Sequence, residues 1–214
     1  MWVYGLCVDC NRFAGSRYDL AYAAFARGLS RWYSTGVHVF DPSVQGVSIA
    51  PGRVSRSVLS GMMGISPQIR VLHAALATQM MAGGPVRLPG NLALRVSVYL
   101  GREAQLTGPM LSGFTDGSHR AINTLASITF EPLSWALTTT DDGDALGESG
   151  WADATEWLRF EDDAESIDLR TLHSHGLAVG NQILHAPGGD FFQLYSSEIA
   201  AIMIGRVPPS QTLR

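Results

Sequence analysis

The sequence predicts an α+β fold, in which an N-terminal mixed β-sheet with helices is followed by a mainly α-helical C-terminal part. Large apolar side chains recur at steps of four and three between Tyr18 and Trp32, which is the spacing of one helical face. Leu92 to Leu100 alternates instead between apolar and polar side chains, as a half-buried strand does. Because no repeat, low-complexity tract or linker interrupts the chain, we expect one domain over residues 1–214.

Capping residues, glycines and prolines set the limits of the elements expected in the N-terminal half. Ser16 with Asp19 forms a capping pair at a helix start, and Gly36 ends that helix. The Ser66-Pro67 pair places a cap and a first-turn proline at the start of a second helix. The expected elements are strands at 3–8, 37–40, 47–49 and 92–100 and helices at 16–36 and 66–81.

The C-terminal half is expected to be mostly helical. Its glycine-rich, acidic stretch from Thr139 to Gly150 predicts a solvated loop. The Pro187-Gly188 turn precedes a final strand and an apolar segment. The expected helices lie at 120–126, 132–138, 151–160 and 169–183, and the apolar segment at 199–207.

Composition predicts a chain with a sizeable core and no membrane span. Hydrophobic residues make up 46% of the 214 positions, yet no stretch reaches the length and apolarity of a spanning helix. Polar Asp9, Asn11 and Arg12 stand too early for a signal peptide. The protein is therefore either intracellular or exported with a signal that has been trimmed away.

The charges are distributed unevenly along the chain. All 15 basic residues are arginine; residues 1–107 hold ten arginines and four acids (+6), and residues 108–214 hold five arginines and fifteen acids (−10), which sum to −4. An acidic chain is not a usual nucleic-acid-binding composition. A phosphate-rich partner would therefore meet the arginine-rich N-terminal half, and the acidic run from Asp141 to Asp168 would face mostly away from it.

Neither the cysteines nor the histidines predict a metal site. Cys7 and Cys10 form one C-x-x-C pair without a second pair, which we interpret as two incidental thiols in an edge strand. His173 and His175, with His119 or His185 as a third ligand, form a minor alternative, because the helix expected there would point positions i and i+2 apart. We expect no metal and no cofactor.

The chemistry-bearing residues occur in an ordered set. Glu156 and Arg159 are three residues apart, one turn along a helix, which by itself is usual for a solvated ion pair. Upstream lie the alternating strand that ends near Tyr99 and the Gly117-Ser118-His119 turn; downstream lies Ser174-His175-Gly176. In this order the set resembles the active site of the ribosome-inactivating proteins, the ricin A-chain and Shiga-toxin A family of rRNA N-glycosylases.

The resemblance implies a pocket that holds an adenine by its faces. Stacking on flat side chains can contribute ~1–3 kcal/mol per base. Tyr99 would supply one face and the backbone of Leu100 would contact the base edge. His119 stands where the family has its second stacking tyrosine, and Gly117 matches the glycine whose carbonyl contacts adenine. His175 replaces the tryptophan that lines the pocket floor.

The resemblance also implies the reaction. Glu156 would stabilise the oxocarbenium-like ribosyl cation and polarise the attacking water, and Arg159 would assist protonation of the leaving base. The substrate would be the sarcin–ricin loop of large-subunit rRNA in the ribosome, the product adenine, and the result inhibited translation. Such a chain is a secreted toxin acting in a target cytosol, or cytoplasmic, and a separate cell-binding B subunit is left open.

Two other classes of function remain open. The chain fits a non-catalytic structural protein of β-rich build, such as a viral coat subunit. It also fits a toxin-like fold that only binds its ligand. In the structural protein, Tyr99, His119 and the Glu156–Arg159 pair would have ordinary structural roles, whereas in the binding module Tyr99 would still bind adenine.

Overall fold

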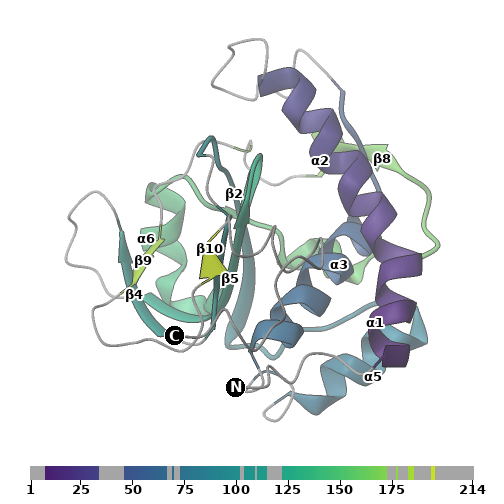
Figure 1. Ribbon diagram of the computed structural model, residues 1–214, viewed down its shortest axis with the longest axis horizontal. Helices are drawn as coiled ribbons and strands as arrows, with labels where there is room; N and C mark the ends of the chain where they lie inside the picture. The colour runs from purple at the N-terminus through teal and green to yellow at the C-terminus, as the bar shows by residue number, and fades with distance from the viewer. Residues whose placement is uncertain are drawn as a thin grey trace.

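The computed structural model describes residues 8–33, 46–66, 69, 73–101, 104–108, 110–114, 122–172, 177, 183–185 and 194–195 (Figure 1). The helical elements are α1 (Val8–Ala14), the π-helical segment η1 (Gly15–Asp19), α2 (Leu20–Tyr33), α3 (Pro51–Ile65), α5 (Ala74–Ala82) and α6 (Gly143–Glu148). Three short 3₁₀ segments follow in the second half: η2 (Thr140–Asp142), η3 (Thr155–Arg159) and η4 (Leu169–Thr171).

The strands form one large antiparallel sheet and one small one. They are β1 (Ser48–Ile49), β2 (Leu92–Val98), β3 (Gln105–Thr107), β4 (Met110–Phe114), β5 (Ile122–Phe130), β6 (Leu133–Thr139), β7 (Ala152–Asp153), β8 (Ile167–Asp168), β9 (Ile183–His185) and β10 (Leu194–Tyr195). In the described part of the chain, the large sheet has the order β10-β3-β5-β6-β2-β7, with β4 paired to β5 and β9, and β1 pairs with β8.

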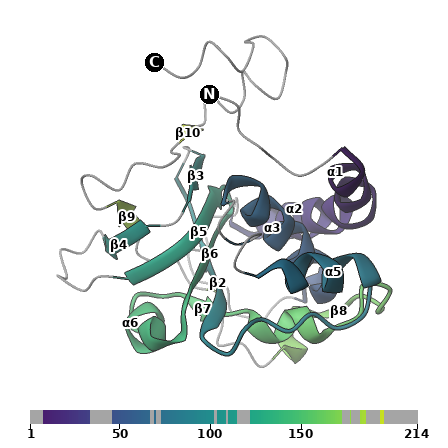
Figure 2. The same cartoon turned by 90° about the horizontal axis from the view of Figure 1, so that it is seen from below.

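The helices α1, α2, α3 and α5 lie on one side of the large sheet, with α3 packed against β5 and α1 and α2 packed on α3, and α6 lies on the other side (Figures 1 and 2). Period-two alternation explains this packing on β6, where Leu133, Trp135 and Leu137 join the hydrophobic core. The residues between them point to the α6 side and are also buried. The sheet is therefore covered on both faces.

The first helical segment runs without a break from α1 through η1 into α2. Tyr18, Phe25 and Leu29 are at most 1% exposed and anchor it to the core. The helix α3 begins with Pro51 at its first position, where the missing N–H costs no hydrogen bond. The helix α5 ends at Gly83, whose φ of 79° is the left-handed conformation that favours glycine.

The predicted α+β class and several N-terminal elements are confirmed, with corrections. The strands expected at 47–49 and 92–100 are present as β1 and β2. Ser16 is not an N-cap: it lies inside the continuous helical segment, and its hydroxyl donates to the Phe13 carbonyl at 3.1 Å. Val8 and Cys10 are both expected in a strand, but both lie in the helix α1, which begins at Val8.

The helix predicted at 66–81 is confirmed in part: Ile69 is helical and its amide donates to the Ser66 carbonyl at 3.1 Å. Ser66 is the C-cap of α3, which the sequence did not predict, and the later helix, α5, covers 74–82. Glycines and serines depress helix propensity across residues 51–65. Burial of Val54, Leu59 and Met62 outweighs that intrinsic preference.

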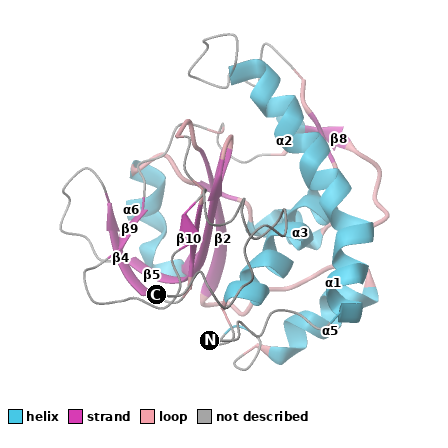
Figure 3. Cartoon of the chain, viewed as in Figure 1, coloured by secondary structure: helices cyan, strands magenta, loops and turns pink. Residues whose placement is uncertain are grey.

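The predicted mainly helical C-terminal part is wrong for the described residues, which are colored mostly as strands and loops in Figure 3. The described parts of the helices expected at 120–126 and 132–138 lie almost entirely in β5 and β6. Their β-branched side chains and two-residue alternation favour strands. The sheet is also antiparallel throughout its described ladders rather than mixed.

Three further expectations are corrected in this half. The helix predicted at 151–160 is the short strand β7 followed by the 3₁₀ segment η3. The helix predicted at 169–183 begins as the 3₁₀ segment η4 and meets β9 at Ile183. The loop predicted at 139–150 contains η2 and α6. The elements expected at 37–40 and 199–207 lie outside the described residues.

Among the described residues, no helix combines the length and apolar composition that crossing a bilayer requires.

Candidate functional site

Tyr99 and Leu100, expected at the end of the strand 92–100, directly follow β2, which ends at Val98. The Tyr99 amide donates to the Pro132 carbonyl at 2.9 Å, and Leu100 is 40% exposed. A Cβ on Gly101 would overlap the Tyr99 ring, so this ring lies against its own backbone two residues on. The hydroxyl end of the predicted stacking tyrosine therefore contacts the chain's own backbone.

Glu156 and Arg159 lie on the turn η3 and bind each other. Their Oε2 and Nη1 atoms are 2.9 Å apart, and the two side chains are 64% and 68% exposed. The same turn buries Trp157 against Phe25 and Trp135, with ring centroids 6.0 and 5.8 Å away. Burying Trp157 directs the charged pair to solvent.

The structure does not bring Tyr99 and Glu156 together. The Leu94 amide donates to Thr155 Oγ1 at 3.0 Å, which fixes η3 beside the start of β2. Tyr99 follows the other end of that strand, five residues beyond Leu94, or about 17 Å at ~3.3 Å per residue. Neither cavity described below is lined by either residue.

The other predicted binding residues, Gly117, His119 and His175, lie outside the described residues. The described residues contain no group of three or more His, Cys, Asp or Glu side chains placed to hold a metal. Of the histidines weighed as ligands, His185 is on β9, whereas His173 also lies outside the described residues.

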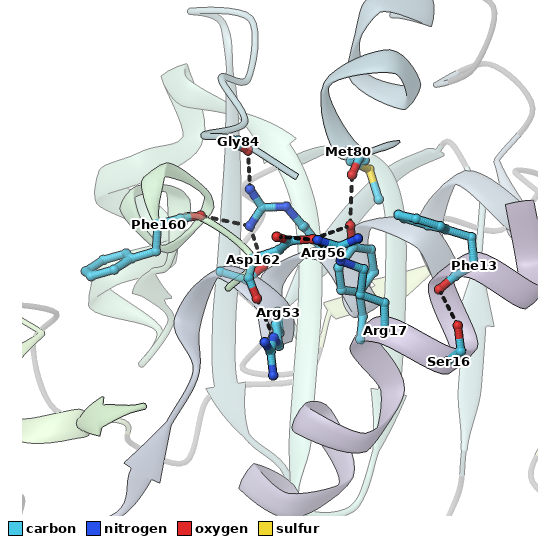
Figure 4. A network of polar contacts seen from close by, with 11 residues as sticks. Phe13, Ser16, Arg17, Arg53, Arg56, Met80, Gly84, Phe160 and Asp162 are labelled. Atoms are coloured by element: carbon cyan, nitrogen blue, oxygen red, sulfur yellow. Dashed lines mark hydrogen bonds and ion pairs between the residues drawn. The ribbon is translucent and has the colours of Figure 1, made fainter. Parts of the chain in front are cut away.

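Asp162 is the centre of a polar network that the sequence did not single out (Figure 4). Its carboxylate is 3% exposed and pairs with Arg17: Nη2 donates to Oδ1 at 2.9 Å, and Nε contacts Oδ2. The Tyr18 hydroxyl lies 3.4 Å from Oδ2 and donates to the Met80 carbonyl at 2.8 Å. One carboxylate thereby joins η1 to the segment that follows η3.

The backbone of the same segment holds two further arginines. Arg53 Nε donates to the Asp162 carbonyl. Arg56 is fully buried and donates through Nη1 to the carbonyls of Gly52 at 2.7 Å and Phe160 at 2.9 Å. Figure 4 shows these contacts around Asp162. Carbonyl oxygens thus satisfy much of the hydrogen-bonding demand of the buried guanidinium.

A groove of about 690 Å³ lies on the outer side of this network, between α2, β1 and the start of α3. Arg17, Arg31 and Arg53 line it from three elements. Ser16, Ser48 and Ser166 add hydroxyls, and the remaining lining residues are small or apolar. A second cavity of about 50 Å³, among α1, α3 and α5, is apolar and bordered by methionines.

The start of α3 adds positive potential to the groove. Its N-cap, Ala50, makes no side-chain cap hydrogen bond, and its first turn contains no acidic residue. Both Ala50 and Arg53 line the groove. The amino end of a helix carries a partial positive charge and open N–H donors, which favour a nearby anion.

The arrangement suits an anion better than a reaction centre. Arginine stays charged in proteins and binds phosphate oxygens through its planar set of N–H donors. The hydrogen bond to Asp162 raises the pKa of the Arg17 guanidinium further. Asp162 uses Arg17 Nε and Nη2 and its carbonyl uses Arg53 Nε, so donors on both arginines remain for a ligand.

The uneven distribution of charge along the chain predicts part of this groove. The arginine excess of residues 1–107 predicts where a phosphate-rich partner would bind, and the groove arginines Arg17, Arg31 and Arg53 all come from that half. No sequence pattern predicts the role of Asp162, because its neighbours Glu161 and Asp163 are also acidic and are exposed.

No family model matches this chain, and neither a curated protein nor a solved structure is similar enough to match it.

Proposed function

We propose that this chain binds RNA, and that the groove lined by Arg17, Arg31 and Arg53 contacts the phosphate backbone. The observation on which this proposal rests is the composition of the groove. Its described lining residues include three arginines and three serines but no acidic side chain. Arginine and hydroxyl donors are the groups that bind phosphate oxygens. The uncapped start of α3 supports the same ligand class.

An RNA strand fits the distribution of these arginines better than a single small anion does. Arg17 precedes α2 and Arg31 lies in its last turn, so the two flank the groove from opposite ends of one helix. A lone phosphate could contact only one end. A chain of phosphates can contact both, and each neutralised phosphate adds affinity through counterion release.

The first test is binding of a labelled RNA by fluorescence anisotropy. We expect Arg31→Gln to weaken binding severalfold, because it removes one charge from the groove without touching the Asp162 network. Arg87→Gln is the matched control, since Arg87 is also exposed but does not line the groove. Equal losses in both variants, or no RNA binding by the unmodified chain, would contradict the proposal.

Depurination of the sarcin–ricin loop, which the resemblance implies, is a second and chemically more demanding proposal. The observation that supports depurination is the Glu156–Arg159 pair, whose Oε2 and Nη1 atoms are 2.9 Å apart on an exposed turn. Because Tyr99 follows the far end of β2, it cannot hold a base whose ribose reaches Glu156. The reaction would need other stacking groups beside η3.

The test of depurination is incubation with ribosomes followed by aniline cleavage of the rRNA. A fragment produced by the unmodified chain and by Glu165→Ala, but lost in Glu156→Ala, would support it; Glu165 is an exposed acid outside η3. If the unmodified chain releases no fragment, the enzymatic claim fails and the RNA-binding proposal still stands. In that case the non-catalytic binding alternative is favoured.

A further inference from the structure

We infer that the groove recognises the phosphate backbone of base-paired RNA and makes no base-specific contact, which rests on the RNA binding proposed above. The inference concerns the class of RNA, because unpaired and paired strands present different groups to a protein. Unpaired strands offer base faces and edges, whereas a duplex offers mainly phosphates and sugar hydroxyls.

The described lining of the groove offers no platform for unpaired bases, because it contains no aromatic residue on which a base could stack. Its arginines could contact guanine edges, but the deep, narrow major groove of a paired RNA keeps those edges out of reach of side chains. Its polar groups are the arginines and the serine hydroxyls of Ser16, Ser48 and Ser166. These are the groups that contact phosphate and ribose.

The dimensions of the groove fit one strand of a duplex. From Arg17 to Arg31 there are 14 helical steps, or about 21 Å at ~1.5 Å per residue. A strand of an A-form RNA duplex places one phosphate about every 3 Å along the axis, a little closer than in DNA, so the arginines would flank about seven phosphates.

The floor of the groove allows a close approach. Ala21, Ala24 and Gly28 line it from α2, and none has a side chain longer than a methyl group. At Gly28 an added Cβ would stand 3.2 Å from Val47 Cγ1, so a larger side chain there would press on the opposite wall. A phosphate backbone can therefore lie against α2 within reach of arginines at both ends.

Charge favours the duplex over a single strand. Double-stranded nucleic acid carries about one charge per 1.7 Å of axis, so more counterions are released per arginine contact. An unpaired strand compensates for its lower charge density by stacking on aromatic side chains. The described lining offers no such stacking.

The experiment compares RNA duplexes of two unrelated sequences with their separate strands, at one salt concentration, by fluorescence anisotropy. Duplexes of roughly twelve base pairs exceed the stretch of about seven phosphates expected in the groove. We expect the two duplexes to bind within about fivefold of each other, since one base-specific contact would produce a larger difference. The single strands should bind several times more weakly than either duplex.

Two variants localise the duplex to the groove. Ala24→Glu places a negative side chain on the exposed floor and should reduce duplex binding at least tenfold by repulsion and steric block. Ala75→Glu adds the same charge to an exposed position of α5 outside the groove and should leave binding nearly unchanged. Matching unfolding curves for the two variants would exclude misfolding as the cause.

The outcomes separate this inference from the proposal beneath it. RNA binding that prefers single strands, or that differs more than about fivefold between the duplexes, overturns the inference and leaves RNA binding intact. If Ala24→Glu leaves duplex binding intact, the RNA binds another surface, and the inference is overturned as well. Absence of binding to every RNA overturns both.

Discussion

At the scale of the residue, Asp162 fixes two of the three groove arginines. Its carboxylate pairs with Arg17, and its carbonyl accepts from Arg53. Its own amide donates to the Gly83 carbonyl at 3.0 Å, so the residue also joins the end of α5. Groove geometry and local stability therefore depend on the same buried acid.

Replacing Asp162 should destabilise the fold measurably. Asp162→Ala removes both bonds to Arg17, whose side chain is 45% exposed, together with the packing of a carboxylate that is 3% exposed. We expect a loss of about 1–3 kcal/mol in the free energy of unfolding, the usual range for losing hydrogen bonds between charged groups. Urea denaturation measures it. Asp163→Ala, at the exposed neighbour, should stay within about 0.5 kcal/mol of the unmodified chain.

The sequence could not distinguish these two acids. Both belong to the acidic run that predicts a solvated surface, and nothing local indicates that one of them turns inward. The distinction arises from Arg17, 145 positions earlier, and from the Gly83 carbonyl. Pairing over that separation is fixed by tertiary structure alone.

At the scale of the element, glycines decide how closely α3 meets the segment after η3. An added Cβ on Gly52 would stand 2.6 Å from the Phe160 carbonyl oxygen and 2.5 Å from that of Glu161. On Gly64, in the last turn of the same helix, it would meet no atom within 4 Å. The first glycine is required by a close approach and the second is not.

These two glycines predict opposite effects of the same substitution. Gly52→Ala should destabilise the fold by about 1–3 kcal/mol, because overpacking forces the backbone apart. Gly64→Ala should stabilise it by up to about 1 kcal/mol, because alanine has the higher helix propensity. Thermal unfolding of the two variants checks both. Equal shifts in Tm would show that the contact between Gly52 and the backbone of Phe160 and Glu161 leaves room for a Cβ, contrary to the structure.

Sequence patterns predict the elements in which hydrophobic periodicity is strong. They fail for elements whose amino-acid composition favours a different secondary structure. The four-and-three spacing around Phe25 and the alternation of β2 both correspond to observed elements. The same two-residue alternation occurs on β6, within the segment 132–138 for which a helix is expected. The helix α3 was missed because its glycines and serines are poor helix formers, and its burial against the sheet cannot be read locally.

At the scale of the whole molecule, the uneven distribution of charge predicted more of the candidate site than the motifs did. The N-terminal half supplies all three groove arginines, as its excess of +6 indicates. Of the acidic C-terminal half, Ser166 alone among the described lining residues reaches the groove. By contrast, the motif residues Tyr99 and Glu156 adjoin opposite ends of β2, because their sequence order does not specify the antiparallel register of that strand with β7.

The salt dependence of RNA binding tests the central claim most directly. The logarithm of the association constant should fall linearly with the logarithm of salt concentration, because arginines displace counterions from phosphates. Arg31→Gln should lower the magnitude of that slope by about one, as expected for one lost phosphate contact, while Arg87→Gln leaves it unchanged. A slope in Arg31→Gln equal to that of the unmodified chain would contradict a phosphate-binding groove between α2 and α3.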